Sequence, residues 1–403
     1  MSRKLLATSV AAIALCFALP GLAFADSATI IQQNETNGQA SQNQPGGEGA
    51  DIALGANIAY ISQSGGTGDV AIQQQNRQQF TTPPDSAASG QQSIIQLNNT
   101  TGAQASQTDN SSASVQTINQ TGNTGSVSTT ATQTINAPNG GWAPDGSQPG
   151  QTQTATQTSN QGSSISQIIG ASNDPLAVTY NNQQTATQTS QVSSSITQSL
   201  DGETANGNTQ TATQDPGSSN TINQSILSSG VGNTQNASID NGSANTIGQS
   251  QNGGSGNVQT ASVSGGDSNV LNQTQNTSTT GVQTASVTNG YFNSVTQTQG
   301  GSGNGQTATI NASNHDNVNQ YQYQGVGGGN VQSAGVSAGA NSGTIDQYQD
   351  NGVSGGQQYA TQTGSSTNNQ IFQYQGNSGN YANAVQTGGS GNVAKQNQGG
   401  VHY

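Results

Sequence analysis

Two sets of glutamines at a fixed separation constrain the fold of this chain more than any other feature. The first set opens the tripeptide Gln-x-Ala, with Ala382 in the equivalent place of the last repeat: Gln153, Gln184, Gln210, Gln235, Gln259, Gln283, Gln306, Gln332 and Gln358. The second set follows an apolar residue by two positions: Gln167, Gln198, Gln224, Gln249, Gln273, Gln297, Gln320, Gln347, Gln373 and Gln396. Within a repeat the two sets are 14 or 15 residues apart, as from Gln210 to Gln224. Such regularity favours a repeat architecture over a disordered low-complexity segment.

Each repeat contains two predicted strands. Asn208, Gln210 and Ala212 alternate with threonines, and the same period of two recurs around Gln224. β-Branched residues at this period predict strands of about seven residues. Corners such as "DPGSS" and "NGGSG" are rich in Gly and Asn, which accept the positive φ of tight turns. Repeats of about 24 to 25 residues with two strands and two corners predict an all-β fold, a cross-β β-solenoid of stacked strand-turn-strand coils.

The alternation places amide side chains among the inward residues. A buried amide without a partner destabilises a protein by roughly 1 to 3 kcal/mol. Identical amides stacked in register bond to the coils above and below, so the sequence predicts Asn/Gln ladders with both glutamine sets as rungs. The sixth place of the first strand accepts either Gln, as at Gln214, or an aliphatic residue, as at Ile239.

The N-terminal residues 1–25 are typical of a secretory signal peptide. Arg3 and Lys4 precede an apolar run, and a small-residue pattern ends at Ala25. Pro20 and the length of the run disfavour a membrane anchor. Cleavage would remove Cys16, the single cysteine, so we expect a secreted, extracellular protein with neither a disulfide nor a thiolate metal site.

Composition excludes several functions. Beyond the leader only Arg77 and Lys395 are basic, against 17 acidic residues, which excludes a nucleic-acid surface. His315 and His402 have no carboxylate or nucleophile at a recognisable spacing. We therefore expect no enzyme activity, no cofactor and no metal site.

Regularity differs along the chain. Residues 151–403 keep the repeat, whereas residues 26–150 are expected to form irregular N-terminal solenoid coils or a partly disordered arm. A Pro/Gly insertion, "NAPNGGWAPDGSQPG", lies near 136–150. Segments around Gln96 and Gln120 look like strands of the same kind, and the number of coils in this range stays open.

The repeats resemble those of the curlin family, the subunits of curli fibres on bacterial surfaces. The residues that fit the family pattern, with Gly-rich corners between them, are Ile371, Gln373, Gly379, Asn380, Ala382, Gln386, Gly391, Asn392, Ala394 and Gln396. The resemblance implies a subunit that is exported through an outer-membrane pore and polymerises with itself into extracellular amyloid fibres, with a nucleating subunit as a further partner. Such fibres would serve biofilm matrix, adhesion or surface attachment. The last repeat is among the most regular, and an uncapped strand edge of this kind also favours head-to-tail addition.

Two other functions share the predicted fold. A surface adhesin that remains monomeric would differ only at its ends. Outward threonines such as Thr154, Thr156 and Thr211 suggest a Thr-ladder ice-binding face, although the ladder is less regular in later repeats. Tyr321, Tyr348 and Tyr374 follow the constant Gln of consecutive coils and predict an outer aromatic column, either stabilising or adhesive.

Overall fold

A computed structural model describes residues 27–35, 37–43, 58–75, 91–99, 102–109, 114–124, 128–136, 151–170, 181–201, 206–227, 230–323, 328–350 and 354–399. These residues form 31 strands and no helix. The expected signal peptide lies outside the described residues, and so does the expected Pro/Gly insertion apart from Asn136.

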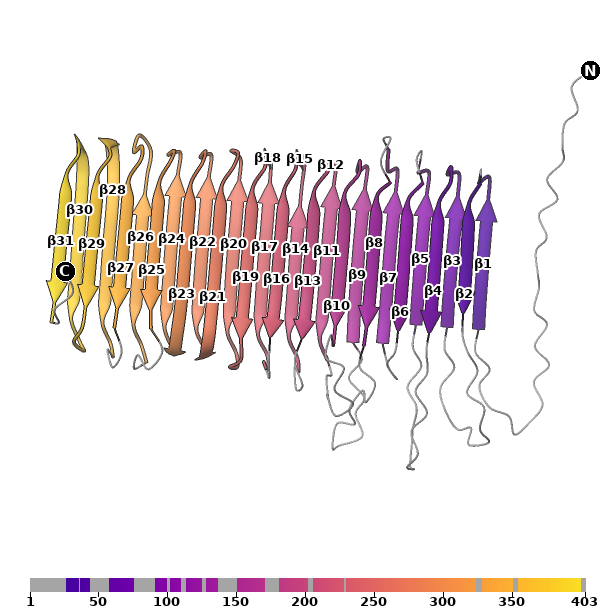
Figure 1. The fold of residues 1–403 in the computed structure, drawn as a ribbon, viewed down its shortest axis with the longest axis horizontal. Coiled ribbons are helices and arrows are strands. Elements are labelled where there is room, and N and C mark those ends of the chain that lie inside the picture. Colours follow the sequence, from indigo (N-terminus) through magenta and orange to yellow (C-terminus); the bar gives the residue numbers. More distant parts are fainter. Residues whose placement is uncertain are drawn as a thin grey trace, which may run out of the picture.

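Two parallel sheets of 14 strands each extend along the whole stack, and the chain alternates between them (Figure 1). The first sheet consists, in spatial order, of β1 (Ser27–Gln33), β3 (Ile58–Ser64), β5 (Gln91–Leu97), β7 (Ser114–Thr121), β9 (Gln151–Thr158), β11 (Gln183–Thr189), β14 (Thr209–Gln214), β17 (Thr234–Asp240), β20 (Val258–Ser264), β22 (Val282–Thr288), β24 (Gly305–Asn311), β26 (Val331–Val336), β28 (Gln357–Thr367) and β30 (Tyr381–Ser390).

The second sheet consists, in the same manner, of β2 (Gln39–Asn43), β4 (Val70–Gln75), β6 (Gln104–Asp109), β8 (Thr130–Ile135), β10 (Ser164–Ile169), β13 (Ser195–Asp201), β16 (Thr221–Leu227), β19 (Thr246–Asn252), β21 (Val270–Thr279), β23 (Ser294–Ser302), β25 (Asn317–Gln322), β27 (Thr344–Gln349), β29 (Gln370–Gln375) and β31 (Val393–Gln398). A small third sheet at one corner contains β12 (Gln191–Val192), β15 (Gly217–Ser218) and β18 (Gly242–Ser243).

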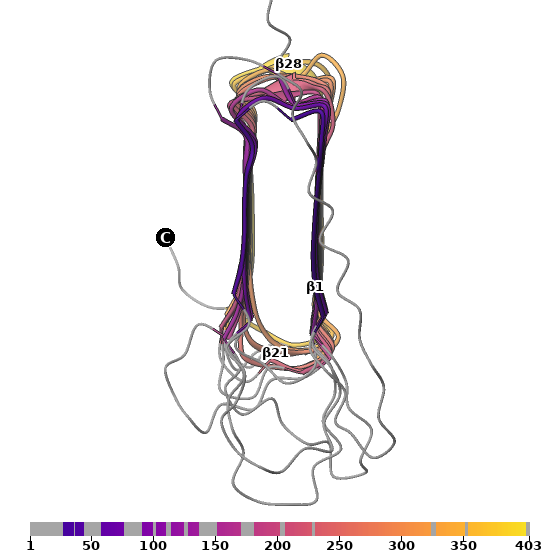
Figure 2. The same cartoon turned by 90° about the vertical axis from the view of Figure 1, so that its right-hand side faces the viewer.

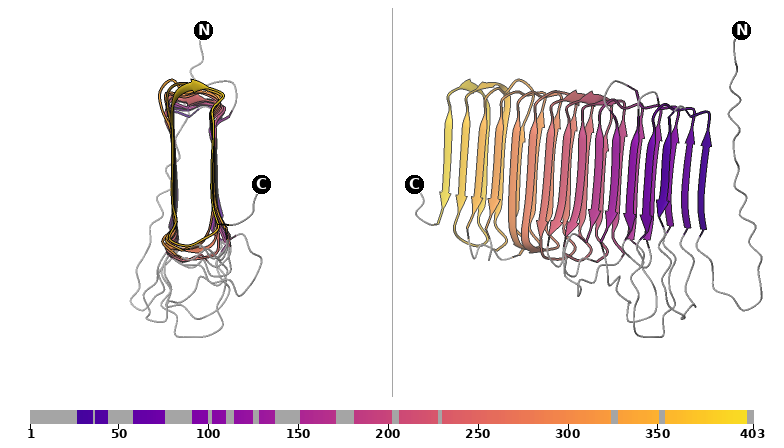
Figure 3. Two further views of the ribbon diagram at one scale, coloured as in Figure 1. Left: turned by 90° about the vertical axis from the view of Figure 1, so that its left-hand side faces the viewer. Right: turned by 45° about the vertical axis from the view of Figure 1, so that its right-hand side comes forward.

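Viewed along the stack, the coils superpose as a narrow rectangle whose long sides are the two sheets (Figure 2, Figure 3). Each strand pairs in parallel and in register with its equivalents in the neighbouring coils, as Gln184 does with Gln153 and Gln210. The described part of residues 26–150 forms the first four coils, β1 to β8, which continue both sheets in register. The predicted all-β solenoid with strand-turn-strand coils is confirmed.

Aliphatic residues form two inward columns of the core, one on each sheet. In the first four coils the large residue is on the first sheet and an alanine on the second: Ile30 with Ala40, Ile61 with Ala71, Ile94 with Ala105, and Ile118 with Ala131. From β9 to β29 the two exchange sheets, so that the first sheet supplies an alanine and the second an Ile, Leu or Val, as with Ala155 and Ile165. In the last coil both places hold alanine, Ala384 and Ala394.

Both corners of a typical coil place a residue with positive φ just before a buried asparagine. Ser219 (φ 55°) precedes Asn220, and Gly232 (φ 63°) precedes Asn233. A Cβ atom added at Gly232 would meet no heavy atom within 4 Å, so conformation and not space favours glycine there. The turn at each corner therefore directs the Asn side chain into the core, and the next strand begins directly after it.

Candidate functional site: the amide ladders

The first predicted glutamine set forms one continuous ladder inside the solenoid. From Gln153 to Gln332, each Nε2 donates a hydrogen bond of 2.7–2.9 Å to Oε1 of the Gln in the next coil, and Gln358 is the last acceptor. All nine side chains are buried. The ladder starts earlier than the sequence indicated, at Gln92 and Gln116, and it ends where Ala382 takes the place of Gln.

The second glutamine set forms a ladder with one rung in every coil. It extends from Gln42 to Gln396 through bonds of 2.6–2.9 Å. Its four rungs in residues 26–150 were missed by sequence reasoning: Gln42, Gln73, Gln107 and Gln133. Each of them follows an alanine by two positions, which is the same signal, but loops of unequal length hid the period.

Each glutamine also ties the two sheets together. Gln224 Nε2 donates to Gln249 Oε1 at 2.8 Å and to the backbone oxygen of Thr211 at 3.0 Å, in the first sheet. Gln210 Nε2 donates likewise to Gln235 Oε1 at 2.8 Å and to the backbone oxygen of Ser199 at 3.1 Å. One amide hydrogen therefore points along the stack and the other across it. This double use explains why an amide is retained where an aliphatic side chain would fit.

Two further glutamine ladders follow one another along the stack: one on the first sheet ends just before the coil in which the other begins on the second sheet. The first sheet carries Gln32, Gln63, Gln96, Gln120, Gln157, Gln188 and Gln214, each bonded to the next. At the following coil Ile239 succeeds Gln214, while on the second sheet Gln251 succeeds Ile226. The second sheet then carries Gln251, Gln275, Gln299, Gln322, Gln349, Gln375 and Gln398.

The direction of these bonds determines which amide atoms stay unpaired. Because Nε2 always donates toward the C-terminal side, the first glutamine of a ladder has no donor for its Oε1. Among the described residues, the buried Gln Oε1 atoms without a partner belong to Gln92, Gln251 and Gln362. Their predecessors in the same columns are Ala59, Ile226 and Val336. Each orphan thus marks the start of a ladder.

Asparagines form a separate ladder at the corner that leads into the second sheet. The backbone N–H groups of Asn245, Asn269, Asn293 and Asp316 each donate to Oδ1 of the preceding member, beginning with Asn220, at 2.9–3.1 Å. The carboxylate of Asp316 occupies an Asn position and accepts from the backbone N–H of Gly343 at 2.7 Å. Burial raises the pKa of Asp316, opposed in part by the hydrogen bond from Ser313.

The predicted tyrosine column is present on the outer face of the second sheet. Tyr321, Tyr348 and Tyr374 occupy one register position of β25, β27 and β29. The rings of Tyr321 and Tyr348 stack with centroids 4.9 Å apart, and the Tyr374 hydroxyl donates to Asp350 at 2.8 Å. Partial burial, followed by the nearby carboxylate of Asp346, raises the pKa of Tyr348 to about 12.

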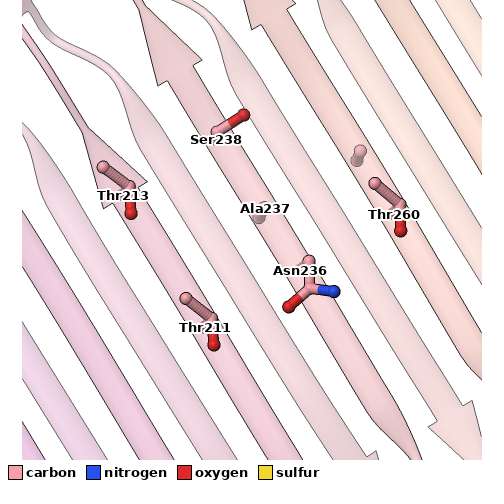
Figure 4. Close-up of a pocket in the computed structure, with 7 residues that line it drawn as sticks. Thr211, Thr213, Asn236, Ala237, Ser238 and Thr260 are labelled. Atoms are coloured by element: carbon pink, nitrogen blue, oxygen red, sulfur yellow. The ribbon is translucent and has the colours of Figure 1, made fainter.

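The outer face of the first sheet is flat and bears hydroxyl groups. A shallow depression there is lined by the outward side chains of Thr211, Thr213, Asn236, Ser238 and Thr260 (Figure 4). One outward column of this sheet reads Thr117, Thr154, Thr185, Thr211, Asn236, Thr260, Thr284 and Thr307. No residue lining the depression is ionisable, so it offers no acid, base or metal ligand.

Over the described ranges, no group of three or more His, Cys, Asp or Glu residues could hold a metal ion. No helix in that part of the chain is long and apolar enough to cross a membrane. No protein-family model matches the sequence, and no curated protein is significantly similar to it. The resemblance to curlins is therefore neither supported nor contradicted by these comparisons.

Proposed function

We propose that the protein is a secreted structural subunit that polymerises head-to-tail into extracellular, curli-like amyloid fibres used in biofilm matrix, adhesion or surface attachment. The observation that carries the proposal is the common direction of the glutamine ladders. From Gln42 to Gln396, every rung donates from Nε2 to the Oε1 atom of the next rung. The first coil consequently presents acceptors and the last coil presents donors.

The two end coils are complementary in hydrogen bonding. Gln42 Nε2 donates to Gln73 and to the backbone oxygen of Thr29, while its Oε1 accepts from no described residue. Gln396 Nε2 donates only to the backbone oxygen of Asn383, at 2.6 Å, and uses no second acceptor among the described residues. A second molecule placed on either end would supply the missing partner. Because this contact joins unlike surfaces, it repeats without closing and produces a filament.

Unpaired strand edges at the same two ends also favour association. Among the described strands, β1 and β2 pair on one side only, and so do β30 and β31. Exposed edges of this kind are templates for another chain, and soluble solenoids cover them with a cap. The leader-like residues 1–25 and the curlin-like repeats support export through an outer-membrane pore, with a nucleating subunit as a further partner. The proposal includes no cofactor, nucleic acid or membrane anchor.

The purified protein is tested by electron microscopy and X-ray diffraction of aligned samples over a range of concentrations. We expect unbranched fibres above a critical concentration, accelerated by added seeds, and a reflection near about 4.8 Å along the fibre axis. A protein that stays monomeric at every concentration would refute polymerisation and favour the monomeric adhesin. Secretion is tested separately: removal of residues 1–25 is expected to retain the protein inside the cell.

Ice binding is a second candidate, favoured by one observation. The outward threonine column of the first sheet extends over eight coils and is interrupted only by Asn236. An ice-recrystallisation assay on the monomer distinguishes the two functions, with replacement of Thr211 and Thr260 by Lys as the test of the face.

A further inference from the structure

The last coil of the stack lacks a residue that the other coils contain. In the two aliphatic columns of the core, each coil from β1/β2 to β28/β29 contributes one large residue and one alanine. In β30 and β31 both contributions are alanines, Ala384 and Ala394. This coil therefore lacks the large aliphatic side chain of the other coils, and no described strand covers its outer side.

The first coil, in contrast, has a large aliphatic residue in a core column that is left exposed. Ile30 belongs to an inward column, because it pairs in register with Ile61, which is completely buried. Ile30 itself is 46% exposed, since no described strand lies on that side of β1. An aliphatic side chain aligned with the core but open to solvent is a candidate contact for another molecule.

The polar columns of the two end coils match as well. Carrying each column through the sheets places Gln386 in line with Gln32 and Gln396 in line with Gln42. The column of the first glutamine set ends in alanine at both ends, at Ala382 and Ala28. In these three columns, a junction in this register thus stacks amide on amide or alanine on alanine, so that none of their amides faces an apolar residue.

We propose that the β30/β31 coil of one molecule docks on the β1/β2 coil of a second copy in continuous register, with Ile30 seated over Ala384 beside Ala394. In this junction Gln396 Nε2 donates to Gln42 Oε1 of the next copy, and Gln386 donates to Gln32. The inference rests on the proposed polymerisation and adds to it the identity of both surfaces and their register. It predicts a fibre whose junctions continue the internal stack.

Engineered cysteines test the register directly. Ser41 and Lys395 are outward residues at equivalent positions of β2 and β31, so the junction brings them onto neighbouring strands. Strands about 4.8 Å apart satisfy the Cα separation that a disulfide requires. Fibres of Ser41→Cys/Lys395→Cys, made with Cys16→Ser, are oxidised and run on a non-reducing gel. The matched control is Ser41→Cys/Val393→Cys, whose partner lies on the same face but about 8 Å away because of the two-residue offset.

We expect disulfide-linked multimers from the first pair and none above background from the offset pair. Fibres that form normally but cross-link equally in both, or from Ser41→Cys alone, would overturn the register and leave polymerisation standing. Complete absence of fibres, including from the unaltered protein, would instead refute the polymerisation on which the inference rests. Fibres without any cross-link would indicate that another segment or another subunit covers the end coils, and would overturn the junction.

A second variant tests the aliphatic contact. Ile30→Ala is expected to raise the critical concentration about tenfold, because burial of a side chain of this size is worth at least that factor. The control Ile72→Ala removes a residue of similar exposure, 47%, that points outward from the second sheet and lies outside the proposed junction. Equal critical concentrations for the two variants would overturn the role of Ile30 and leave polymerisation standing.

Discussion

Gln251 lies directly after Ile226 in one column of the second sheet, and its buried Oε1 has no hydrogen-bond partner. The preceding coil offers a methyl group where a donor would be needed. Further along the same column, Gln275, Gln299 and Gln322 are bonded on both sides. The contribution of a buried glutamine to the stability of the protein therefore depends on its place in the ladder as well as on its amide group.

The same substitution should have different effects at the start and in the middle of this ladder. Gln299→Ile leaves Gln275 Nε2 without its acceptor and Gln322 Oε1 without its donor, at about 1 to 3 kcal/mol for each buried group. Gln251→Ile only moves the start of the ladder to Gln275, so we expect a change within about 1 kcal/mol. Urea unfolding of the monomeric variants measures the difference. Equal destabilisation by the two changes would contradict the ladder account.

Asp316 should make stability depend on pH. Its pKa is raised by burial, so the folded state disfavours the charged form. The associated stability is fully present below the carboxyl's ordinary pKa and is lost as the pH rises through the raised value. We expect Asp316→Asn to raise the unfolding midpoint at pH 7 and to flatten its dependence on pH, because Asn occupies this column in preceding coils. The control is Asp240→Asn, the same replacement at an exposed position, and an equal rise of the midpoint in both variants would contradict the role of burial at Asp316.

Removal of the tyrosine column should affect stability more than assembly. The triple variant with Ser at Tyr321, Tyr348 and Tyr374 loses ring stacking worth about 0.5 to 1.5 kcal/mol per pair. We therefore expect a lower thermal midpoint with unchanged fibre elongation. The control replaces Ser199, Ser225 and Ser250, which occupy the same outward column in earlier coils, with Ala. A loss of fibre bundling or surface binding specific to the tyrosine variant would instead identify the column as an adhesive face.

Replacement of Gly232 and of Gly305 distinguishes a conformational requirement for glycine from a steric one. A Cβ atom at either Gly232 or Gly305 would meet no heavy atom within 4 Å, but only Gly232 has a positive φ, of 63°. Gly232→Ala should destabilise the solenoid by about 1 kcal/mol, and Gly305→Ala should be neutral or stabilising by about 0.4 to 1 kcal/mol. Thermal unfolding of both variants provides the measurement, and a destabilisation shared by both would contradict the conformational explanation.

The sequence predicted the architecture because the spacing from Gln210 to Gln224 repeats along the chain. A fixed spacing requires corners of constant length, and such corners keep equivalent residues of successive coils in register. It also predicted why Gln is inside, since only stacking satisfies a column of amides. The tyrosine column followed from the same register.

Other features were less accessible from sequence. The rung at Gln133 escaped detection because the connections among the first coils differ in length, although Ala131 precedes it at the usual distance. The ladder that starts at Gln251 was missed because its column holds Leu200 and Ile226 in earlier coils. A column that changes from aliphatic to amide has no constant residue, and only the three-dimensional stack shows that the other sheet changes in the opposite sense at the same coil.

The glutamine ladders also give the molecule an electric dipole along the stack. Backbone hydrogen bonds between coils point both ways, as Thr221 N donates forward to Asn245 O and Gly232 N donates backward to Asn206 O, so their dipoles largely cancel. The glutamine side-chain bonds all point the same way, from Gln42 to Gln396 in the longest series, and their dipoles add as peptide dipoles do in a helix. The donor end therefore carries a partial positive charge and the acceptor end a partial negative one. A fibre built from such units would have a net dipole along its length and two physically different tips.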